Sequence, residues 1–232
     1  MIIRDLAGMA EFRQAEALQY AVWGADDMAD PADLMMVIQA EGGLAAGAFD
    51  GGTLVGYVFA FPTRTPHIQH SHRLAVLERA RGTGLGAALK WYQRDWCLAR
   101  DITPVRWTYD PLRAANARLN IGVLGAQVTT YYPDYYGAME GINKGTPSDR
   151  LLADWHLNAP AVVARASGQR PTPDGLRIVI PKDFADLMVS DPERAANDRL
   201  RLRDALTQKL GTGHMIIGFD PVACAYILAK VI

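Results

Sequence analysis

The sequence predicts an α/β fold of the α+β kind, in which amphipathic helices alternate with strands and neighbouring strands run antiparallel. The clearest strand signal is "GGLAAGAFDGGTLVGYVFAFP", two apolar runs around Asp50-Gly51-Gly52, which suits a tight hairpin turn. The clearest helix signal spans about 84–100, where leucine and aromatic residues recur at spacings of four, three and four. With 232 residues, 50% of them apolar and 21% charged, the chain has the composition of a globular protein.

The other elements of the N-terminal two thirds follow from the same patterns. Apolar runs predict short strands, and 3.6-residue periodicity predicts the helices between them. Gly125 suits the C-cap of a short helix. In order we expect a strand at "MIIRDL", a helix over 7–23, a short helix after "DDMADPADLM", a strand over 70–76, a strand at "PVRWTYD", a helix over 114–124, and strands at "AQVTTYY" and "LLADWHL".

The hydrophobic periodicity of the sequence weakens after Leu157. Three prolines and two glycines in "NAPAVVARASGQRPTPDG" predict a linker over 158–176 between a core of residues 1–157 and an extension of residues 177–232. The extension reads as a strand "LRIVIP", a charged and solvated helix over 192–210, and an apolar closing hairpin. Such a hairpin must extend a sheet or pair with a second subunit, so a homodimer through it is expected as one alternative.

Charge and cysteine usage limit the class of protein. A net charge of −1 gives no basic surplus for nucleic acid or an anionic membrane. Charged residues every few positions at the N-terminus argue against a signal peptide or a spanning helix. Cys97 and Cys224 form no CxxC pair and read as reduced packing cysteines of a cytoplasmic protein.

Three alternate glycines, Gly82, Gly84 and Gly86, stand between a predicted strand and the long helix. A P-loop would need Lys followed by Ser or Thr after its last glycine, and the chain lacks this. A dinucleotide fingerprint fits GxGxxA, but "LERAR" separates the strand from the first glycine and a hairpin comes first, unlike the opening βαβ unit of that fold. The arrangement Arg81-x-x-Gly84-x-Gly86 instead lets backbone N–H groups approach a diphosphate at a helix N-terminus, without a metal.

The segment "LAVLERARGTGLGAALK" and the order of elements over 1–157 resemble the GNAT superfamily of acyl-CoA-dependent N-acyltransferases. The resemblance implies a mixed, mostly antiparallel sheet flanked by helices, with coenzyme A or acyl-CoA as co-substrate and no metal. It implies that the strand end hydrogen-bonds the pantetheine arm and the glycine turn holds the pyrophosphate. The cofactor-binding residues are then Leu74, Ala75, Val76, Arg81, Gly82, Thr83, Gly84, Leu85, Gly86 and Asn116.

Two histidines are the candidates for the general base. Several family members carry a Glu where this chain has His70, and His72 is expected on the same strand face. An imidazole can accept the proton of an amine directly or through water, with His70 the leading candidate. Two other readings stay open: hydrogen-bonded structural histidines, and a metal pair that lacks a third ligand at obvious spacing.

The usual general acid of the family is replaced, because Ile121 stands where the family usually has Tyr. The loop "TTYYPDYYG" offers four substitutes, from which we take Tyr136, unless the thiolate leaves unassisted. Asp110, at the end of its strand, and Asn120, one helical turn from Asn116, are expected to contact substrate.

The segments "HSH", "WTYDPL", "NARLN" and "YYG" resemble a branch of the superfamily in which some members use succinyl-CoA and amino acids. A dicarboxylic donor would need cationic side chains, and the candidates are Arg73, Arg113, Arg118 and Arg150. We therefore expect transfer of an acetyl or succinyl group to the amine of a small molecule, an amino acid, by direct attack in a ternary complex. The alternatives are a non-catalytic acyl-CoA-binding module and an NAD-dependent dehydrogenase.

Overall fold

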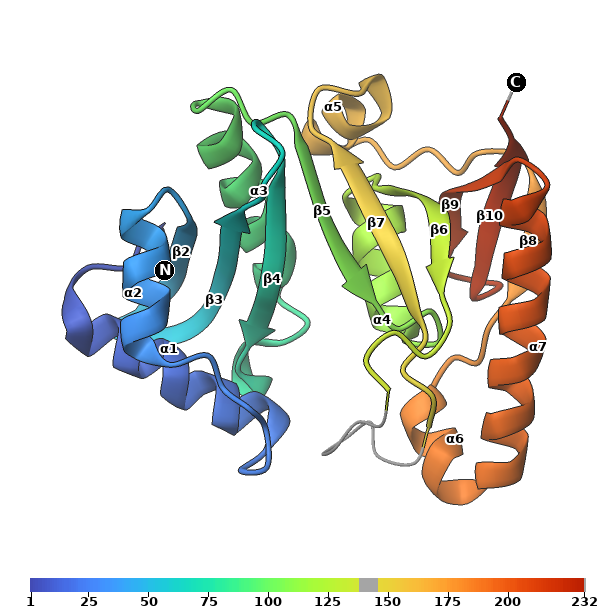
Figure 1. Ribbon diagram of the computed structural model, residues 1–232, viewed down its shortest axis with the longest axis horizontal. Helices are drawn as coiled ribbons and strands as arrows, with labels where there is room; N and C mark the ends of the chain where they lie inside the picture. The colour runs from blue at the N-terminus through green and yellow to red at the C-terminus, as the bar shows by residue number, and fades with distance from the viewer. Residues whose placement is uncertain (138–145, 232) are drawn as a thin grey trace. The chain divides into compact units, whose positions relative to one another are not determined.

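The computed structural model describes residues 1–137 and 146–231, and the chain forms two compact units (Figure 1). The first unit contains residues 1–106, and the second contains the described residues from 107 onward. The division falls within strand β5 (Pro104–Tyr109), upstream of the predicted linker. The C-terminal strands do not form a separate unit, because they pair with each other and with a strand of the second unit.

The first unit has the strand order β1-β2-β3-β4-β5, antiparallel throughout except for the parallel pair β4 and β5. Gly51 and Gly52 form the predicted hairpin turn with φ of 56° and 85°, conformations that glycine adopts at little cost. The elements before β5 are β1 (Ile2–Asp5), α1 (Gly8–Trp23), α2 (Ala32–Ala40), β2 (Leu44–Asp50), β3 (Thr53–Pro62), β4 (Gln69–Val76), the 3₁₀ turn η1 (Glu78–Ala80) and α3 (Leu85–Leu98).

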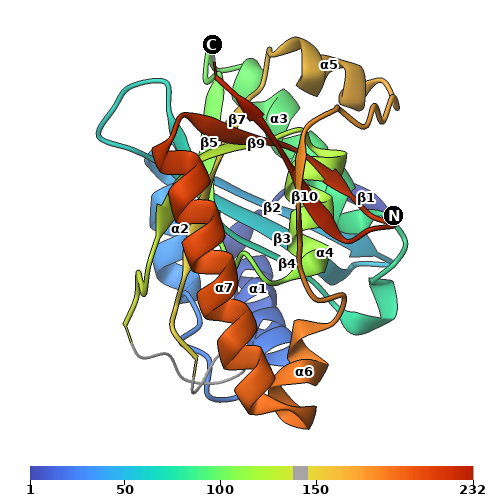
Figure 2. The same cartoon turned by 90° about the vertical axis from the view of Figure 1, so that its right-hand side faces the viewer.

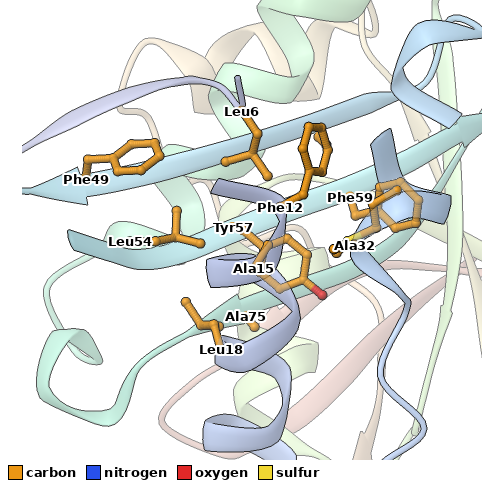
Figure 3. Close-up of a cluster of buried hydrophobic side chains, with 12 residues drawn as sticks. Leu6, Phe12, Ala15, Leu18, Ala32, Phe49, Leu54, Tyr57, Phe59 and Ala75 are labelled. Carbon is orange, nitrogen blue, oxygen red and sulfur yellow. The ribbon is translucent and has the colours of Figure 1, made fainter. Parts of the chain in front are cut away.

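Successive residues of β3 face opposite sides of this sheet, as the period of a strand requires. Tyr57 belongs to a buried cluster with Phe12 and Leu18 of α1 (Figure 3). Gly56 faces α3, and a Cβ added there would lie 3.2 Å from Cδ1 of Leu89. Helices therefore cover both faces, with α3 packed close to the sheet.

A β-bulge interrupts the pairing of β3 with β4. Phe59 lies opposite Arg73, whereas Ala60 lies opposite Ser71, so His72 is the extra residue. A bulge turns adjacent side chains toward one face and can re-aim a functional group. In agreement, His72 and Arg73 both contact the loop between α1 and α2.

The second unit has the strand order β5-β7-β6-β9-β10-β8. Its helix α7 packs against β6 and β9 (Figure 2). The predicted mixed, mostly antiparallel sheet with an additional C-terminal αβ segment is confirmed. The elements are α4 (Ala114–Ala117), the π-helical segment η2 (Arg118–Val123), β6 (Gln127–Tyr132), β7 (Arg150–His156), α5 (Pro160–Ala166), β8 (Leu176–Val179), α6 (Phe184–Ser190), α7 (Pro192–Gly211), β9 (His214–Asp220) and β10 (Ala225–Lys230).

The closing hairpin extends the sheet, which is one of the two expected alternatives. Ile216 of β9 pairs with Val128 of β6, and β8 pairs with the other edge of β10. Because both strands of the hairpin have partners within the chain, burial of the hairpin does not require a second subunit. A homodimer therefore stays a prediction.

Two predictions about the C-terminal third need correction. The segment 158–176 contains α5, which buries Val162 and Arg165 and is too short to show a clear period. Helix α7 is not fully solvated, because it buries a stripe at spacings of four, three and four. That stripe consists of Ala195, Arg199, Leu202 and Leu206. No helix in the described ranges is long and apolar enough to cross a membrane.

Candidate functional site

The glycine turn forms an open cradle at the N-terminus of α3. Gly82 and Gly84 have φ of 77° and 86°, and Gly84 is the N-cap of the helix. A Cβ added at either glycine meets no atom within 4 Å, so the backbone is open to an approaching ligand. The backbone N–H groups of 82–87 make no hydrogen bond to any residue that the structure describes. Free N–H groups at the positive end of a helix dipole are suited to bind an anion.

Two side chains of this segment brace the turn. The Oγ1 of Thr83 donates to the carbonyl of Ala80 at 2.8 Å, and Nε of Arg81 donates to the carbonyl of Val76 at 3.3 Å. Arg81 thus links the turn to the end of β4 and keeps a cation beside the free N–H groups. Leu85 is buried below them as the first residue of α3, and Gly86 follows it.

The edge of β4 beyond His70 is open. The pairing of β4 with β5 consists of Gln69 opposite Val105 and His70 opposite Arg106. Across the described residues no strand continues this pairing along Leu74, Ala75 and Val76. An unpaired strand edge can accept the amides of an extended ligand chain.

His70 and His72 lie on one face of β4, as predicted. Both rings contact Phe61, with centroid distances of 4.9 and 5.5 Å, and the two imidazoles are 6.3 Å apart. Burial, and then the charges of His72, Arg106 and Lys90, lower the pKa of His70 to about 4. His70 is therefore uncharged at neutral pH and is a weak proton acceptor.

His72 is better placed as a base, because a carboxylate orients it. Its Nε2 lies 3.2 Å from Oδ1 of Asp30, and 38% of its side chain is exposed. The side chain of Gln19 in turn holds both backbone polar groups of Asp30, at 2.8 and 3.1 Å. Sequence reasoning missed Asp30 because it lies 42 residues before His72, and the bulge that aims His72 has no sequence signature.

Arg73 holds the loop between α1 and α2 against β4. It donates to Oδ2 of Asp27 and to the carbonyl of Met28, both at 2.6 Å. Its Nε is 3.1 Å from Oδ2 of Asp30, and its guanidinium lies over the ring of Trp23. The structure thus gives Arg73 internal partners in place of the acyl carboxylate considered from the sequence.

A buried polar network lies on the α3 side of β4 and was also missed. Nζ of Lys90 donates to Oγ of Ser71 at 2.9 Å and to Oε1 of Gln93 at 2.6 Å. Gln93 donates to Gln69, which also accepts a bond from Sγ of Cys97. Burial lowers the pKa of Lys90 to about 7, so its charge is labile near neutral pH.

Neither cysteine has the environment of a nucleophile. Burial raises the pKa of the Cys97 thiol to about 12 and also raises that of Cys224. In the part of the chain that the structure describes, no three His, Cys, Asp or Glu side chains are arranged to hold a metal ion.

The tyrosine loop belongs to the second unit. Tyr136 is exposed, with its hydroxyl 3.1 Å from Oγ1 of Thr108 and the guanidinium of Arg150 5.1 Å from its ring. Tyr131 is unsuited as an acid, because its hydroxyl donates to Asp149, and burial and Asp149 raise its pKa far above the ordinary value. This excludes Tyr131, and Tyr136 as the acid stays a prediction from the sequence.

The remaining predicted residues also lie in the second unit, and they do not form a single face. Asp110 is buried and bound by Arg199, so its carboxylate serves an internal ion pair. Asn116 is exposed and Asn120 is buried. Asn116 and Asn120 do not share one helix face as expected, because the helix widens to a π-helix from Arg118.

Comparison with known proteins identifies the first part of this architecture. Residues 9–119 match the acetyltransferase (GNAT) family. Ribosomal-protein-S18-alanine N-acetyltransferase from Escherichia coli is similar, with a TM-score of 0.56 and 16% identity over 68% of this chain and 94% of that one. A ribosomal-protein-alanine N-acetyltransferase from Brucella melitensis gives 0.54 and 20% identity over 66% and 98% of the two chains.

A third solved structure is that of a phosphinothricin acetyltransferase from Sinorhizobium meliloti in complex with AcCoA. It gives a TM-score of 0.54 and 18% identity over 66% of this chain and 86% of that one. At these identities the likeness concerns the fold. No curated protein sequence matches the chain.

Proposed function

Residues 9–119 belong to the acetyltransferase (GNAT) family, and from this premise we propose that the protein transfers an acyl group from acyl-CoA to the primary amine of a small molecule. The observation that carries the proposal is the cradle of free N–H groups over 82–87, behind two glycines of positive φ. These groups and Arg81 are suited to hold a pyrophosphate. The open edge of β4 beside Leu74, Ala75 and Val76 suits the amides of the pantetheine arm.

His72 is the proposed base. The amine must lose a proton as it attacks the thioester carbonyl, and an imidazole fixed by a carboxylate can accept it. Asp30 supports His72 at 3.2 Å, whereas the pKa of about 4 makes His70 a poor acceptor at neutral pH. We assign His70 to the wall of this site, stacked on Phe61. Tyr136 is the proposed donor of a proton to the departing thiolate.

The acyl group moves directly to the amine in a ternary complex. A covalent route would need an exposed thiolate, and burial holds both cysteine thiols in their protonated form. Acetyl-CoA and succinyl-CoA are the proposed donors and an amino acid is the proposed acceptor. The sequence segments shared with the succinyl-CoA-using branch support this finer assignment.

The test has two stages. Thermal shift with coenzyme A, acetyl-CoA, succinyl-CoA and NAD should show stabilisation by the CoA species and none by NAD. Release of free thiol with a panel of amino acids should then identify donor and acceptor. Stabilisation by CoA without thiol release from any amine would favour the non-catalytic binding module, and no stabilisation by CoA would overturn the proposal.

A further inference from the structure

A cavity of about 210 Å³ lies entirely within the second unit. Its walls are the π-helical segment η2, helix α5 with the chain that follows it, and the end of β9. Phe219, Pro171 and Pro221 give it an apolar side. Apart from Arg118, which the sequence offered as a candidate for binding a dicarboxylic acyl group, no residue considered above for the acyl transfer lines it.

Three arginines line this cavity and no acidic residue does. They are Arg118 at the start of η2, Arg165 in α5 and Arg170 in the following segment. Across the described ranges, none of the three forms an ion pair with a carboxylate. Arg165 is buried whereas Arg118 and Arg170 are exposed, and a buried guanidinium without a counter-charge is unusual.

Arg165 is the central group, with 4% of its surface exposed. Its guanidinium donates to the carbonyls of Gly122 and Ala161 at 3.1 Å and of Pro171 at 3.4 Å. These three bonds fix its plane and use three of its five N–H groups, which leaves two for a ligand. Carbonyl dipoles orient the cation and leave its positive charge without a counter-ion.

The neighbouring backbone is shaped around this side chain. Gly125 has a φ of 77°, and a Cβ there would lie 2.8 Å from Cδ of Arg165. Arg170 is tethered in turn, because its Nη1 donates to the carbonyls of Arg165 and Gln169 at 2.7 and 2.9 Å. Arg118 is exposed and makes no side-chain hydrogen bond or ion pair to the described residues. Two fixed guanidinium groups and one free to move thus converge on one cavity.

We propose that this cavity is a binding site for a small organic oxyanion. The ligand carries a carboxylate or phosphate group that takes the free N–H groups of Arg165 and pairs with Arg118 and Arg170. Guanidinium groups match both anions through bidentate hydrogen bonds. An apolar portion of the ligand packs on Phe219 and the two prolines. Burial, and secondarily the charge of Arg170, lower the pKa of Arg165, as expected where positive charges lack a counter-ion.

The test is calorimetric titration of the whole protein without acyl-CoA, using inorganic phosphate, phenyl phosphate and benzoate as probes. Phenyl phosphate should bind saturably and more tightly than inorganic phosphate, because its ring gains the apolar wall. A comparison of phenyl phosphate with benzoate shows which oxyanion the arginines prefer. No saturable binding of any probe up to about 10 mM, where even a millimolar site would be nearly filled, would overturn the proposal.

Variants assign the binding to the cavity. Arg118→Gln and Arg170→Gln should each weaken phenyl phosphate binding by about tenfold or more, through loss of a charge-assisted contact. Arg194→Gln removes the same charge from an exposed position of α7 in the same unit and should leave binding unchanged. Arg165→Gln is a less suitable test because it also removes bonds that hold the fold.

Two results would contradict the assignment. If Arg118→Gln and Arg170→Gln bind phenyl phosphate as the wild type does, the ligand occupies another place. If either variant loses affinity for coenzyme A, the arginines are part of the cofactor site and no separate oxyanion site exists. Because these titrations use no acyl-CoA turnover, failure here leaves the proposed acyl transfer untouched, and the reverse also holds.

Discussion

Arg199 and Asp110, 89 residues apart in the sequence, form a buried bidentate ion pair within the second unit. Nη1 and Nη2 of Arg199 lie 2.9 Å from Oδ1 and Oδ2 of Asp110, and Oδ1 also accepts the N–H of Leu112. The pair links α7 to the residue that follows β5, so the C-terminal extension is joined to the core by a buried contact. A carboxylate that the sequence presents as a substrate ligand is thereby used for folding.

Removal of one partner of this pair should strongly destabilise the protein. Arg199→Gln leaves the carboxylate of Asp110 buried without its cation, at a cost of about 3–5 kcal/mol in the free energy of unfolding. Arg201→Gln, on the same helix, breaks an exposed pair with Asp198 and should cost about 1 kcal/mol or less. Urea unfolding measures both. Equal losses in the two variants would contradict the role given to Asp110.

Glycine substitutions should separate backbone strain from cofactor binding. Gly84→Ala places a side chain at a φ of 86° and Gly52→Ala does so at 85°, each at a cost of about 1–2 kcal/mol in stability. Only Gly84 borders the free N–H groups of 82–87, so only its variant should lose affinity for coenzyme A. Chemical denaturation and CoA titration of both variants check this. Loss of CoA affinity in Gly52→Ala as well would point to a general effect of destabilisation.

The two histidines should differ in their effect on turnover. His72→Gln should lower kcat by about 100-fold, within the usual range for general base catalysis, and His70→Gln should lower it less. Steady-state kinetics at saturating acyl-CoA measures both. A larger loss of kcat in His70→Gln would restore His70 as the base.

Asp30 should act through the orientation of His72. Asp30→Asn removes the charge that holds the imidazole at 3.2 Å, so kcat should fall by about tenfold with KM for the amine little changed. The control is Asp33→Asn, an exposed carboxylate at the start of α2. If Asp30→Asn instead raises KM with kcat intact, Asp30 contacts the amine and does not position the base.

The buried lysine should make stability depend on pH. Unfolded Lys90 keeps its proton to about pH 10.4, whereas the folded pKa is about 7. Between these values the unfolded state binds more protons, so the free energy of unfolding should rise with pH by up to about 1.4 kcal/mol per unit. The comparison belongs between pH 7 and about 8, where unfolded cysteines, whose pKa is about 8.5, are still mostly protonated.

Lys90→Met should remove this rise, and Lys230→Met, at an exposed position at the end of β10, should retain it. Urea unfolding across the pH range gives the slopes. The same slope in Lys90→Met and wild type would show that Lys90 does not titrate in this window.

Most of the fold could be predicted because its information is local. Two apolar runs around a glycine turn mark β2 and β3. The spacing of Leu85, Leu89 and Trp96 marks α3 and its buried face. Helix α5 was missed because seven residues are too few to show a period, and the buried stripe of α7 was hidden by an arginine at a core position.

The site was predictable only where its function depends on the backbone. The cradle at Gly82 and Gly84 could be recognised because the residues that permit positive φ are the ones that form it. His70 and His72 were identified as a pair, but their ranking depended on burial and on Asp30, neither of which is local.

The order of most elements, the hairpin turn and the anion cradle follow from local sequence, because each depends on contacts within a few residues. Which charged groups have partners depends on how distant segments pack together. A bulge in β4 places His72 beside Asp30. Arg199, at a buried position of α7, forms an ion pair with Asp110. Three arginines line one cavity that no carboxylate lines. The reason is that burial and charge pairing depend on which distant segments of the chain come into contact. A local sequence pattern does not specify those contacts.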